Sequence, residues 1–404
     1  MTSRLIIVEP GHFHATLLQK EMYPWLDKRV AVYAPLGPEL LDYLSRVAAF
    51  NARKESPTAW ELDIHTSTDP MAAMLGEHRG NIVVFTGKNR AKIDRILAAL
   101  RVGLNVLADK PWIINSADLP KLETALRLAR EKKIAAYDIM TERYEITSEL
   151  QRELVNDREI FGDPKSVKAR SVHNVMKVVA GVPLRRPAWF FDIAEYGEGL
   201  ADVGTHVVDL VQWTLFPDQP LDWRKDIRIA SGKRWPLVLS PEQFARVTGE
   251  KREAPLEYFC NNSVEYTIRG VPVALEIVWE WEAPAGAGDV YEAAFHGTKA
   301  IVEIRQGAAE KHMPELYVSP DSAAVERRVG VLQARWPGLD VVRNGGEMRI
   351  AIPEKYRVGH EAHFAQVTNR FVEYVNHPAA MPAWEDAYMM AKYYVSTKGV
   401  EVAR

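Results

Sequence analysis

The sequence predicts an α/β fold with an N-terminal doubly wound parallel sheet and a C-terminal α/β domain built on an open, largely antiparallel sheet. Up to about residue 142, short apolar runs alternate with amphipathic helical segments, which is the pattern of a parallel sheet. After residue 143, apolar runs come in pairs joined by tight turns, which is typical of antiparallel strands. The length of 404 residues is enough for more than one domain. We therefore expect one domain over residues 1–142 and a second over residues 143–404.

The first domain is expected to repeat a strand–helix unit, with glycine or proline near several of the turns. The strands are short and mostly apolar, as buried parallel strands are. We expect strands at 4–8, 29–34, 62–67, 81–86, 106–108 and 134–137, and helices at 15–22, 41–54, 93–101 and 117–132.

The second domain is expected to open with a helix and a long strand before its hairpins begin. The turns Gly270-Val271-Pro272 and His296-Gly297-Thr298-Lys299 each lie between two apolar runs, which indicates hairpins. We expect helices at 144–156, 203–215, 358–375 and 384–395, and strands at 165–175, 264–268, 273–281, 291–295, 300–304 and 315–318. Lys168 and Arg170 alternate with apolar residues, which indicates a solvated strand face.

Composition excludes several classes of partner. The formal net charge of -3 gives no electrostatic basis for binding nucleic acid or an anionic membrane. The chain has one cysteine, Cys260, so no intrachain disulfide can form. The apolar run that ends at Val8 is too short for a signal peptide, and no run approaches the ~20 residues of a membrane span. These features favour a cytoplasmic protein.

The turn after the first strand has the strand–turn–helix layout that opens a dinucleotide-binding Rossmann unit. Residues 9–14 read Glu-Pro-Gly-His-Phe-His. Of the three glycines in the usual G-x-G-x-x-G fingerprint, only the middle one is present, as Gly11, which lets backbone approach a pyrophosphate. The second strand ends at Ala34-Pro35, with neither the acidic residue typical of NAD sites nor an arginine for a 2′-phosphate. NAD and NADP both stay open at this position.

Asp109, Lys110 and Pro111 follow the fifth expected strand. In doubly wound sheets, ligands bind beyond the carboxyl ends of the strands, so Lys110 is expected to project into a ligand crevice. The alternative is an ordinary solvated lysine at a strand end.

The stretch from Asp202 to Asp209 contains a second group of polar residues. Asp202 and His206 are four residues apart, so on a helix they would share one face, and Asp209 lies on roughly the same side. A histidine beside a carboxylate is suited to accept a proton near neutral pH. In the alternative interpretations, Asp202 only caps the helix, His206 is a core histidine and Asp209 is solvated or ion-paired.

Taken together, these motifs resemble those of the glucose–fructose oxidoreductase / inositol dehydrogenase / MocA-like (Gfo/Idh/MocA) family. Asp109-Lys110-Pro111 resembles its Glu-Lys-Pro motif, and Asp202 to His206 resembles its Asp-x-Gly-x-His motif, with Asp209 as the following aspartate. Gly197-Glu198-Gly199 is similar to the glycine-rich lead-in, and Asn89 falls at the asparagine of the family's Thr-Pro-Asn-x-x-His motif. The order and separations match over nearly the whole chain.

The resemblance implies a Rossmann domain followed by an α/β domain, and an NAD(P)-dependent dehydrogenase or reductase acting on sugars or polyols. It implies that Lys110 binds the substrate beside the nicotinamide ribose, that His206 accepts a proton, and that Asp202 orients His206 or binds substrate hydroxyls. The cofactor, NAD or NADP with a slight preference for NAD, is expected to contact Gly11, His12, Phe13, His14, Thr86, Asn89, Asp109 and Lys110.

The sequence departs from the family pattern mainly in the cofactor-binding motifs. Asp109 replaces glutamate, Gly87-Lys88 replaces Thr-Pro, and Lys92 replaces the histidine that closes that motif. The outer glycines of the fingerprint and the acidic ribose ligand are missing. The expected catalytic residues Lys110, Asp202 and His206 are unaffected.

Further candidates for substrate binding are His173 and Lys177, at the end of the first strand of the second domain, and Trp189, before the glycine-rich turn. Solvated roles for the first two and a core role for Trp189 are the alternatives. No group of histidines and cysteines has the spacing of a zinc site, so no metal is expected.

Three functions remain open on the sequence. The first is hydride transfer between a nicotinamide cofactor and a hydroxyl-bearing carbon of a sugar or polyol, with a small carbohydrate as the partner. The second is an NAD-dependent glycosidase or lyase that oxidises a sugar ring only transiently. The third is a cofactor-binding regulator without catalysis, which the co-occurrence of Lys110, Asp202 and His206 disfavours. An open sheet face would also suit a homo-oligomer.

Overall fold

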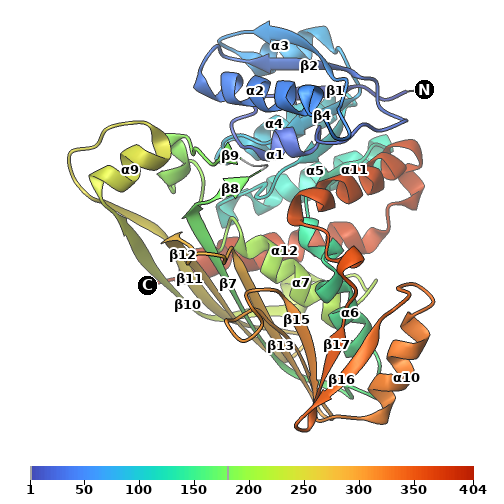
Figure 1. Cartoon of the computed structure of the whole chain (residues 1–404). Helices are drawn as coiled ribbons and strands as arrows, with labels where there is room; N and C mark the ends of the chain where they lie inside the picture. The colour runs from blue at the N-terminus through green and yellow to red at the C-terminus, as the bar shows by residue number, and fades with distance from the viewer. Residues whose placement is uncertain (1, 180–181) are drawn as a thin grey trace. The chain divides into compact units, whose positions relative to one another are not determined.

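The computed structural model describes residues 2–179 and 182–404, which form two compact units (Figure 1). Unit 1 comprises Met1–Met140, Arg186–Gly197 and Phe364–Asp386, and unit 2 comprises Thr141–Arg185, Glu198–His363 and Ala387–Arg404. The boundary expected after residue 142 lies close to the end of the first segment. No sequence pattern indicated that two later segments belong to unit 1.

Unit 1 is built on a parallel sheet with the strand order β3-β2-β1-β4-β5-β6. Its described strands pair only in parallel, and β1 pairs with both β2 and β4. The order reverses between β1 and β4, which is where doubly wound sheets bind ligands. The strands are β1 (Leu5–Val8), β2 (Arg29–Ala34), β3 (Glu61–Thr66), β4 (Ile82–Phe85), β5 (Asn105–Ala108) and β6 (Ala136–Asp138).

The helices of unit 1 follow the amphipathic pattern of the sequence, and every residue of β1, β4 and β5 is buried. The N-terminal helices are α1 (His14–Leu17), α2 (Pro38–Ala52), α3 (Pro70–Glu77), α4 (Lys92–Arg101) and α5 (Leu119–Lys132). Two helices are each divided between the units. In α11 (His360–Asn376) the residues from Phe364 onward belong to unit 1, and in α12 (Ala383–Val402) the residues up to Asp386 do.

Helix α1 is shorter than the sequence predicts, because it ends at Leu17 rather than near residue 22. Beyond Leu17 the backbone tightens into turns, in which the N–H of Gln19 donates to the carbonyl of Thr16 and that of Lys20 to the carbonyl of Leu17. The carbonyl groups that follow accept from side chains later in the chain. Trp60 Nε1 donates to the carbonyl of Gln19 at 2.7 Å, and Arg53 Nη2 donates to that of Lys20 at 2.6 Å. Such long-range bonds do not show in a local pattern.

Unit 2 is built on a mixed sheet with the order β10-β11-β12-β7-β13-β14-β15-β17-β16. The central pair β7·β12 is parallel, whereas the other described pairs are antiparallel. The strands are β7 (Pro164–Met176), β10 (Ile227–Leu239), β11 (Leu256–Ile268), β12 (Val271–Glu282), β13 (Val290–Gly297), β14 (Ile301–Arg305), β15 (Glu315–Ser319), β16 (Asp340–Asn344) and β17 (Glu347–Ala351). A separate small ribbon pairs β8 (Val178–Val179) with β9 (Val182–Pro183).

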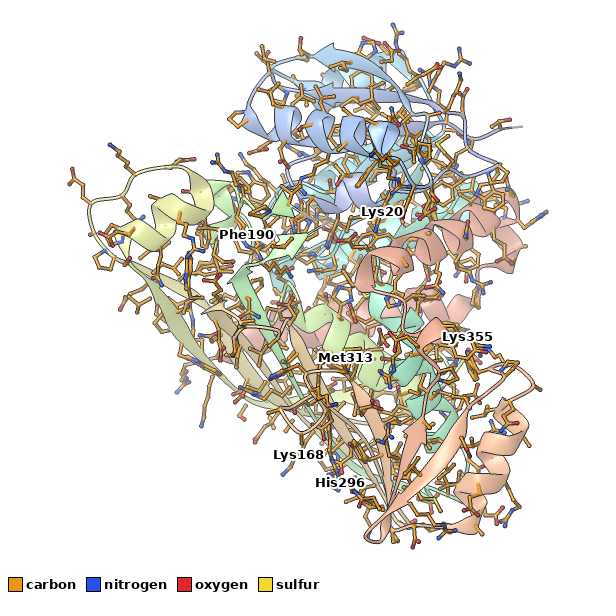
Figure 2. The ribbon with its side chains drawn as sticks, viewed as in Figure 1. Lys20, Lys168, Phe190, His296, Met313 and Lys355 are labelled. Atoms are coloured by element: carbon orange, nitrogen blue, oxygen red, sulfur yellow. The ribbon has the colours of Figure 1, made fainter. Side chains whose placement is uncertain are left out.

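Helices α6 (Ile146–Val155) and α7 (Gly204–Leu215) cover one face of this sheet (Figure 1). Lys168 on β7 is exposed, as its alternating pattern predicts, and β7 pairs with β13, which carries His296 (Figure 2). The remaining helices of unit 2 are α8 (Trp223–Asp226), α9 (Pro241–Thr248) and α10 (Ala323–Leu332).

The predicted α/β class with one parallel and one largely antiparallel sheet is confirmed. Both predicted hairpins form, because β11 pairs with β12 and β13 with β14. Strand β10 and the helices α3, α9 and α10 were not expected. No helix among the described residues is long and apolar enough to cross a membrane.

Candidate active-site residues

The residues expected to bind the cofactor lie at the carboxyl ends of β1, β4 and β5 in unit 1. Gly11 to His14 follow β1, Thr86 and Asn89 follow β4, and Asp109 and Lys110 follow β5. These strands are neighbours and parallel, so all of these residues lie at the same edge of the sheet. The point where the strand order reverses falls between β1 and β4, and therefore among them.

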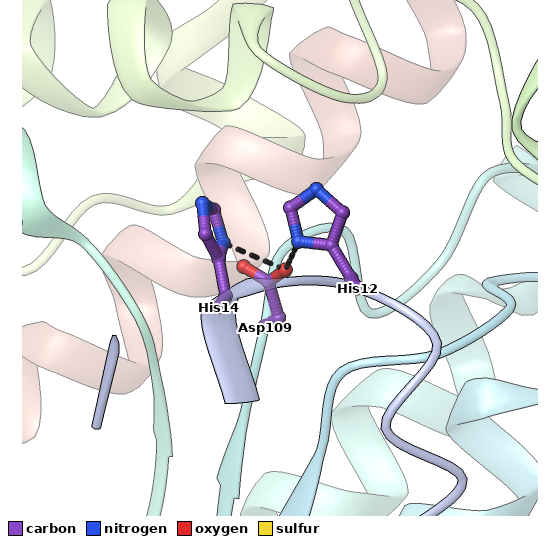
Figure 3. Close-up of side chains that lie close together, drawn as sticks. All are labelled: His12, His14 and Asp109. Carbon is purple, nitrogen blue, oxygen red and sulfur yellow. Dashed lines mark hydrogen bonds and ion pairs between the residues drawn. The ribbon is translucent and has the colours of Figure 1, made fainter. Parts of the chain in front are cut away.

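The carboxylate of Asp109 contacts two histidines from the turn after β1 (Figure 3). His14 Nδ1 lies 2.9 Å from Asp109 Oδ2, and His12 Nδ1 lies 3.1 Å from the same oxygen. All three side chains are buried. The two imidazole rings are packed edge to face, with centroids 4.1 Å apart. The carboxylate therefore ties the turn after β1 to the end of β5.

Burial sets the charges of this cluster. It lowers the pKa of His12 to about 4 and that of His14 to about 3, although Asp109 opposes both shifts. Burial alone would raise the pKa of Asp109, but the two histidines outweigh it and hold that pKa well below its usual range. At neutral pH the cluster is one carboxylate facing two neutral imidazoles, so each Nδ1 atom carries its ring hydrogen.

The neutral histidines predict acid destabilisation. In the unfolded chain both histidines become protonated as pH falls below their usual pKa of 6.5. In the folded protein they become protonated only near pH 4 (His12) and pH 3 (His14). The free energy of unfolding should therefore fall as pH falls from 6.5 towards 4, by roughly 2 kcal/mol per pH unit near pH 5 from these two groups. Urea denaturation at several pH values measures this slope.

The variant His14→Asn keeps a hydrogen-bond donor for Asp109 but cannot be protonated in this range. It should remove about half of the two-histidine contribution to the slope near pH 5. His377→Gln, at an exposed position of the same unit, is the matched control and should leave the slope as it is. An unchanged slope in His14→Asn would show that His14 is not held neutral.

The same three side chains are close enough together to hold a metal ion. Their separations of 2.9 and 3.1 Å are also ordinary hydrogen-bond lengths. The hydrogen bond from His14 accounts for one of these contacts, and the absence of a metal from this protein stays our prediction.

Lys110 is buried directly after Asp109, and its peptide bond to Pro111 is cis. Two neighbours support the backbone here. Lys92 Nζ donates to the carbonyl oxygen of Asp109 at 2.9 Å, and Trp112 Nε1 donates to that of Ala108 at 3.2 Å. Lys92, which replaces the family's histidine, therefore positions the Asp109-Lys110 segment.

The turn after β4 presents polar atoms that a ligand could satisfy. Asn89 Nδ2 donates to the carbonyl of Tyr196 at 2.6 Å. Thr86 Oγ1 and Asn89 Oδ1 are buried and find no hydrogen-bond partner among the described residues. Buried polar atoms without partners are costly, so their presence at the carboxyl edge of the sheet fits a bound polar group such as a dinucleotide.

Side chains of Glu39 and Trp189 pack closely against Gly11. A Cβ atom there would lie 2.8 Å from both Glu39 Oε2 and Trp189 Cζ2. Trp189, a candidate for substrate binding, thus contacts the turn after β1 within unit 1, and its indole Nε1 donates to Glu39 Oε1 at 2.6 Å. The ring of Phe13 contacts those of His12 and His14 at centroid distances of 4.4 and 4.5 Å, tilted against the first and edge to face with the second.

In unit 2, a glycine-rich turn places Asp202 and His206. Gly199 lies against β11, where a Cβ atom would be 2.0 Å from the carbonyl oxygen of Cys260, so only glycine fits. Helix α7 begins at Gly204, so Asp202 precedes it and His206 lies in its first turn. The N-cap is Val203, which does not support a capping role for Asp202. Asp202 is buried and His206 is half-buried.

Asp209 is held in a buried ion-paired group. Arg143 binds its two carboxylate oxygens through Nε at 2.5 Å and Nη2 at 2.8 Å, and Lys392 Nζ lies 3.4 Å from Oδ1. Burial would raise the pKa of Asp209, but these cations and His206 lower it to about 2. Asp209 is thus a fixed anion whose geometry anchors α7, the helix that carries His206.

A second acidic group lies near His206 in unit 2. Glu142 Oε1 is 3.0 Å from His360 Nδ1. Burial raises the pKa of Glu142, but His360, His206 and His363 reverse the shift and lower it. Burial, with the Glu142 carboxylate, raises the pKa of Glu145 to about 7. His206 therefore interacts electrostatically with the carboxylate of Glu142 as well as with that of Asp209.

His173 and Lys177 converge on Asp289, which precedes β13. His173 Nδ1 is 3.1 Å and Lys177 Nζ is 2.6 Å from Asp289 Oδ2. The other ring nitrogen of His173 is 2.7 Å from Ser171 Oγ. The sequence interpretation missed Asp289, Arg143, Glu142 and Glu39. Only Arg143 and Glu142 had a signal, as charged residues a few positions after the last strand of the first domain.

Comparisons with known proteins add to this geometry. Residues 150–404 match the family described as "Putative oxidoreductase C terminal domain". A crystal structure of a "putative oxidoreductase" from Parabacteroides merdae is 41% identical, with a TM-score of 0.94 over 100% of this chain and 97% of that one. Among curated proteins, none matches the sequence.

More distant structures share the fold. The 3-ketoreductase KijD10 from Actinomadura kijaniata, solved with NADP and TDP-benzene, is 13% identical with a TM-score of 0.64 over 100% of this chain and 98% of that one. Levoglucosan dehydrogenase, solved with NADH and levoglucosan, is 14% identical with a TM-score of 0.63 over 100% of this chain and 97% of that one.

Proposed function

Because this chain belongs to the Gfo/Idh/MocA-like family of NAD(P)-dependent oxidoreductases, we propose that it transfers a hydride between a nicotinamide cofactor and a hydroxyl-bearing carbon of a sugar or polyol. The observation that carries the proposal is the buried Lys110 at the carboxyl end of β5, next to the carboxylate of Asp109. A buried ammonium at the ligand-binding edge of a doubly wound sheet is suited to stabilise developing negative charge. The sugar is proposed because the levoglucosan dehydrogenase that shares this fold is solved with levoglucosan.

The cofactor is proposed to be NAD or NADP, held in unit 1 by the residues after β1, β4 and β5. Thr86 Oγ1 and Asn89 Oδ1 offer unsatisfied polar atoms to it, and the turn from Gly11 to His14 lies beside the end of β5 through the Asp109 cluster. When bound, the nicotinamide ring supplies the hydride chemistry.

The residues of this chain would then handle the proton and the charge. His206 takes the proton of the substrate hydroxyl as the carbinol is oxidised, and returns it in the reverse direction. Lys110 stabilises the developing alkoxide oxygen. Asp202 orients His206 or binds a neighbouring hydroxyl, and His173 and Lys177, held by Asp289, bind other hydroxyls of the sugar.

Cofactor titration is the first test. We expect purified protein to bind NAD or NADP saturably, read from the fluorescence of its 11 tryptophans, and to form reduced cofactor with a member of a sugar and polyol panel. Binding of neither cofactor would contradict the proposal.

Two other results would replace it with an alternative function. Cofactor that co-purifies, together with turnover that yields no net NADH, would favour the glycosidase or lyase that oxidises a sugar only transiently. Cofactor binding without turnover of any substrate in the panel would favour a regulatory role.

A further inference from the structure

The segment Arg186–Gly197 returns from later in the chain to unit 1, where it contacts the carboxyl edge of the parallel sheet at two places. The first contact is with the turn after β4. The backbone N–H groups of Asn89 and Arg90 both donate to the carbonyl of Glu195 at 3.0 Å. The side chain of Asn89 donates to the carbonyl of Tyr196 at 2.6 Å. These bonds to the backbone anchor one end of the segment.

The second contact is with the start of α2. Trp189, in the helical turn Ala188–Phe191, donates its Nε1–H to Glu39 Oε1 at 2.6 Å. Glu39 belongs to the first turn of α2, which begins at Pro38. A hydrogen bond of this length from an indole to a carboxylate is charge-assisted and among the stronger ones in proteins. The segment is therefore held at both places by specific hydrogen bonds.

This second contact occupies the space over Gly11. A Cβ atom on Gly11 would lie 2.8 Å from both Glu39 Oε2 and Trp189 Cζ2. Gly11 is the one glycine of the dinucleotide fingerprint that the sequence keeps, and a glycine at this position lets a pyrophosphate approach the backbone. A phosphate group needs more room than a single Cβ atom. The pyrophosphate and the Glu39–Trp189 contact therefore cannot occupy this space together.

Charge opposes a pyrophosphate at the same place. The carboxylate of Glu39 and the pyrophosphate are both negative, and like charges repel strongly at short range. Glu39 lines a pocket at the carboxyl ends of β1, β2 and β4 whose lining also contains two cations, Lys88 and Arg95. Arg95 pairs with Glu9, and Lys88 is exposed. Both shape and charge thus set the Glu39–Trp189 contact against a bound dinucleotide.

We propose that the Glu39–Trp189 contact is autoinhibitory: it covers the position of the pyrophosphate and must open before a dinucleotide binds. The inference rests on the proposed function, because it requires unit 1 to bind NAD or NADP. Glu39 is half-buried, so its side chain can turn towards solvent while the bonds to Glu195 and Tyr196 stay in place. Only molecules in which the contact is open bind the cofactor, so closure lowers the apparent affinity in proportion to the open fraction.

Isothermal titration of NAD, NADP and ADP-ribose into wild type and Glu39→Gln tests the proposal. Glutamine keeps the size of the side chain, but it removes the charge and weakens the bond from Trp189. In Glu39→Gln we expect the dissociation constant of each ligand to fall by about tenfold. ADP-ribose keeps the pyrophosphate without the nicotinamide, so its gain should match that of NAD.

Glu131→Gln is the matched control, since Glu131 is an exposed glutamate on α5 in the same unit; it should leave all three constants unchanged. Trp189→Phe keeps an aromatic ring but removes the donor, so it should lower the constants by a smaller factor. This second variant decides the question if Glu39→Gln does not fold.

The outcomes separate the two proposals. If neither wild type nor the two variants bind a dinucleotide, the proposed function fails and this inference fails with it. If wild type binds NAD or NADP and both variants bind it no more tightly, the oxidoreductase proposal stands and only the autoinhibitory role of the Glu39–Trp189 contact is wrong.

Discussion

His206→Ala is expected to lower kcat by about 10²–10⁴-fold, which is the usual contribution of a positioned general base. His206 is half-buried in the first turn of α7, and the carboxylates of Asp209 and Glu142 act on it electrostatically. Affinity for the cofactor should be unchanged, because the cofactor-binding residues that we propose belong to unit 1. Steady-state kinetics on a substrate from the panel, combined with cofactor titration, measures both effects.

His296→Ala provides the control, because His296 is a half-buried histidine on β13 of the same unit without a proposed role. It should retain wild-type kcat. Added imidazole should partly restore turnover in His206→Ala, whereas a purely structural histidine would not be rescued. Full activity in His206→Ala would show that another group accepts the proton.

Asp209→Ala is expected to lower the free energy of unfolding by about 3–5 kcal/mol, because it leaves buried cations without their counter-ion. Arg143 is 8% and Lys392 is 0% exposed at the side chain, and both contact Asp209. The loss should be complete above the ordinary aspartate pKa of 3.8 and should shrink as pH falls towards the depressed pKa of Asp209, which is about 2. It should persist across the neutral range, where the unfolded chain also carries this carboxylate ionised. Urea denaturation at pH 7 measures it.

Asp163→Ala, which removes an exposed ion pair with Arg158 in the same unit, should change the same free energy by less than about 1 kcal/mol. A triple variant, Arg143→Met with Asp209→Leu and Lys392→Met, should recover much of the lost stability, since apolar residues of similar size can replace a buried charged group. Wild-type stability of Asp209→Ala would mean that water reaches the two cations.

Local sequence patterns were sufficient for most elements of the fold. Strands β1, β2, β4 and β5 are short apolar runs between turns, and the structure places them within one or two residues of the expected ranges. The periodicity of apolar residues depends on positions at most four apart in the chain, so it can be read without knowing the tertiary arrangement. It failed for α1, which ends at Leu17 in tighter turns, after which the carbonyl groups of Gln19 and Lys20 accept from the distant Trp60 and Arg53.

Local patterns also failed for β10, which spans 13 residues, Ile227–Leu239, in which buried and exposed side chains do not alternate regularly. This strand is at the edge of its sheet and pairs only with β11 in the described topology. Its pairing with β11 contains two register shifts, and at the first of them, between Ile229 and Ser231, the extra residue lies in β10 and exchanges the faces of its side chains. A strand of this kind has no period-two signal to detect.

By itself, the sequence determined the fold class, and it singled out candidates for the chemistry: Lys110 after a buried strand, and Asp202 and His206 around a helix start. These follow from residue type and from spacing over a few positions. Only the tertiary structure decided which side chains surround them. Asp109 meets His14 across 95 residues, Arg143 meets Asp209 across 66, and Trp189 meets Glu39 across 150. Such partners are chosen when distant segments pack, because burial makes an unpaired charge or polar group costly wherever its partner lies in the chain.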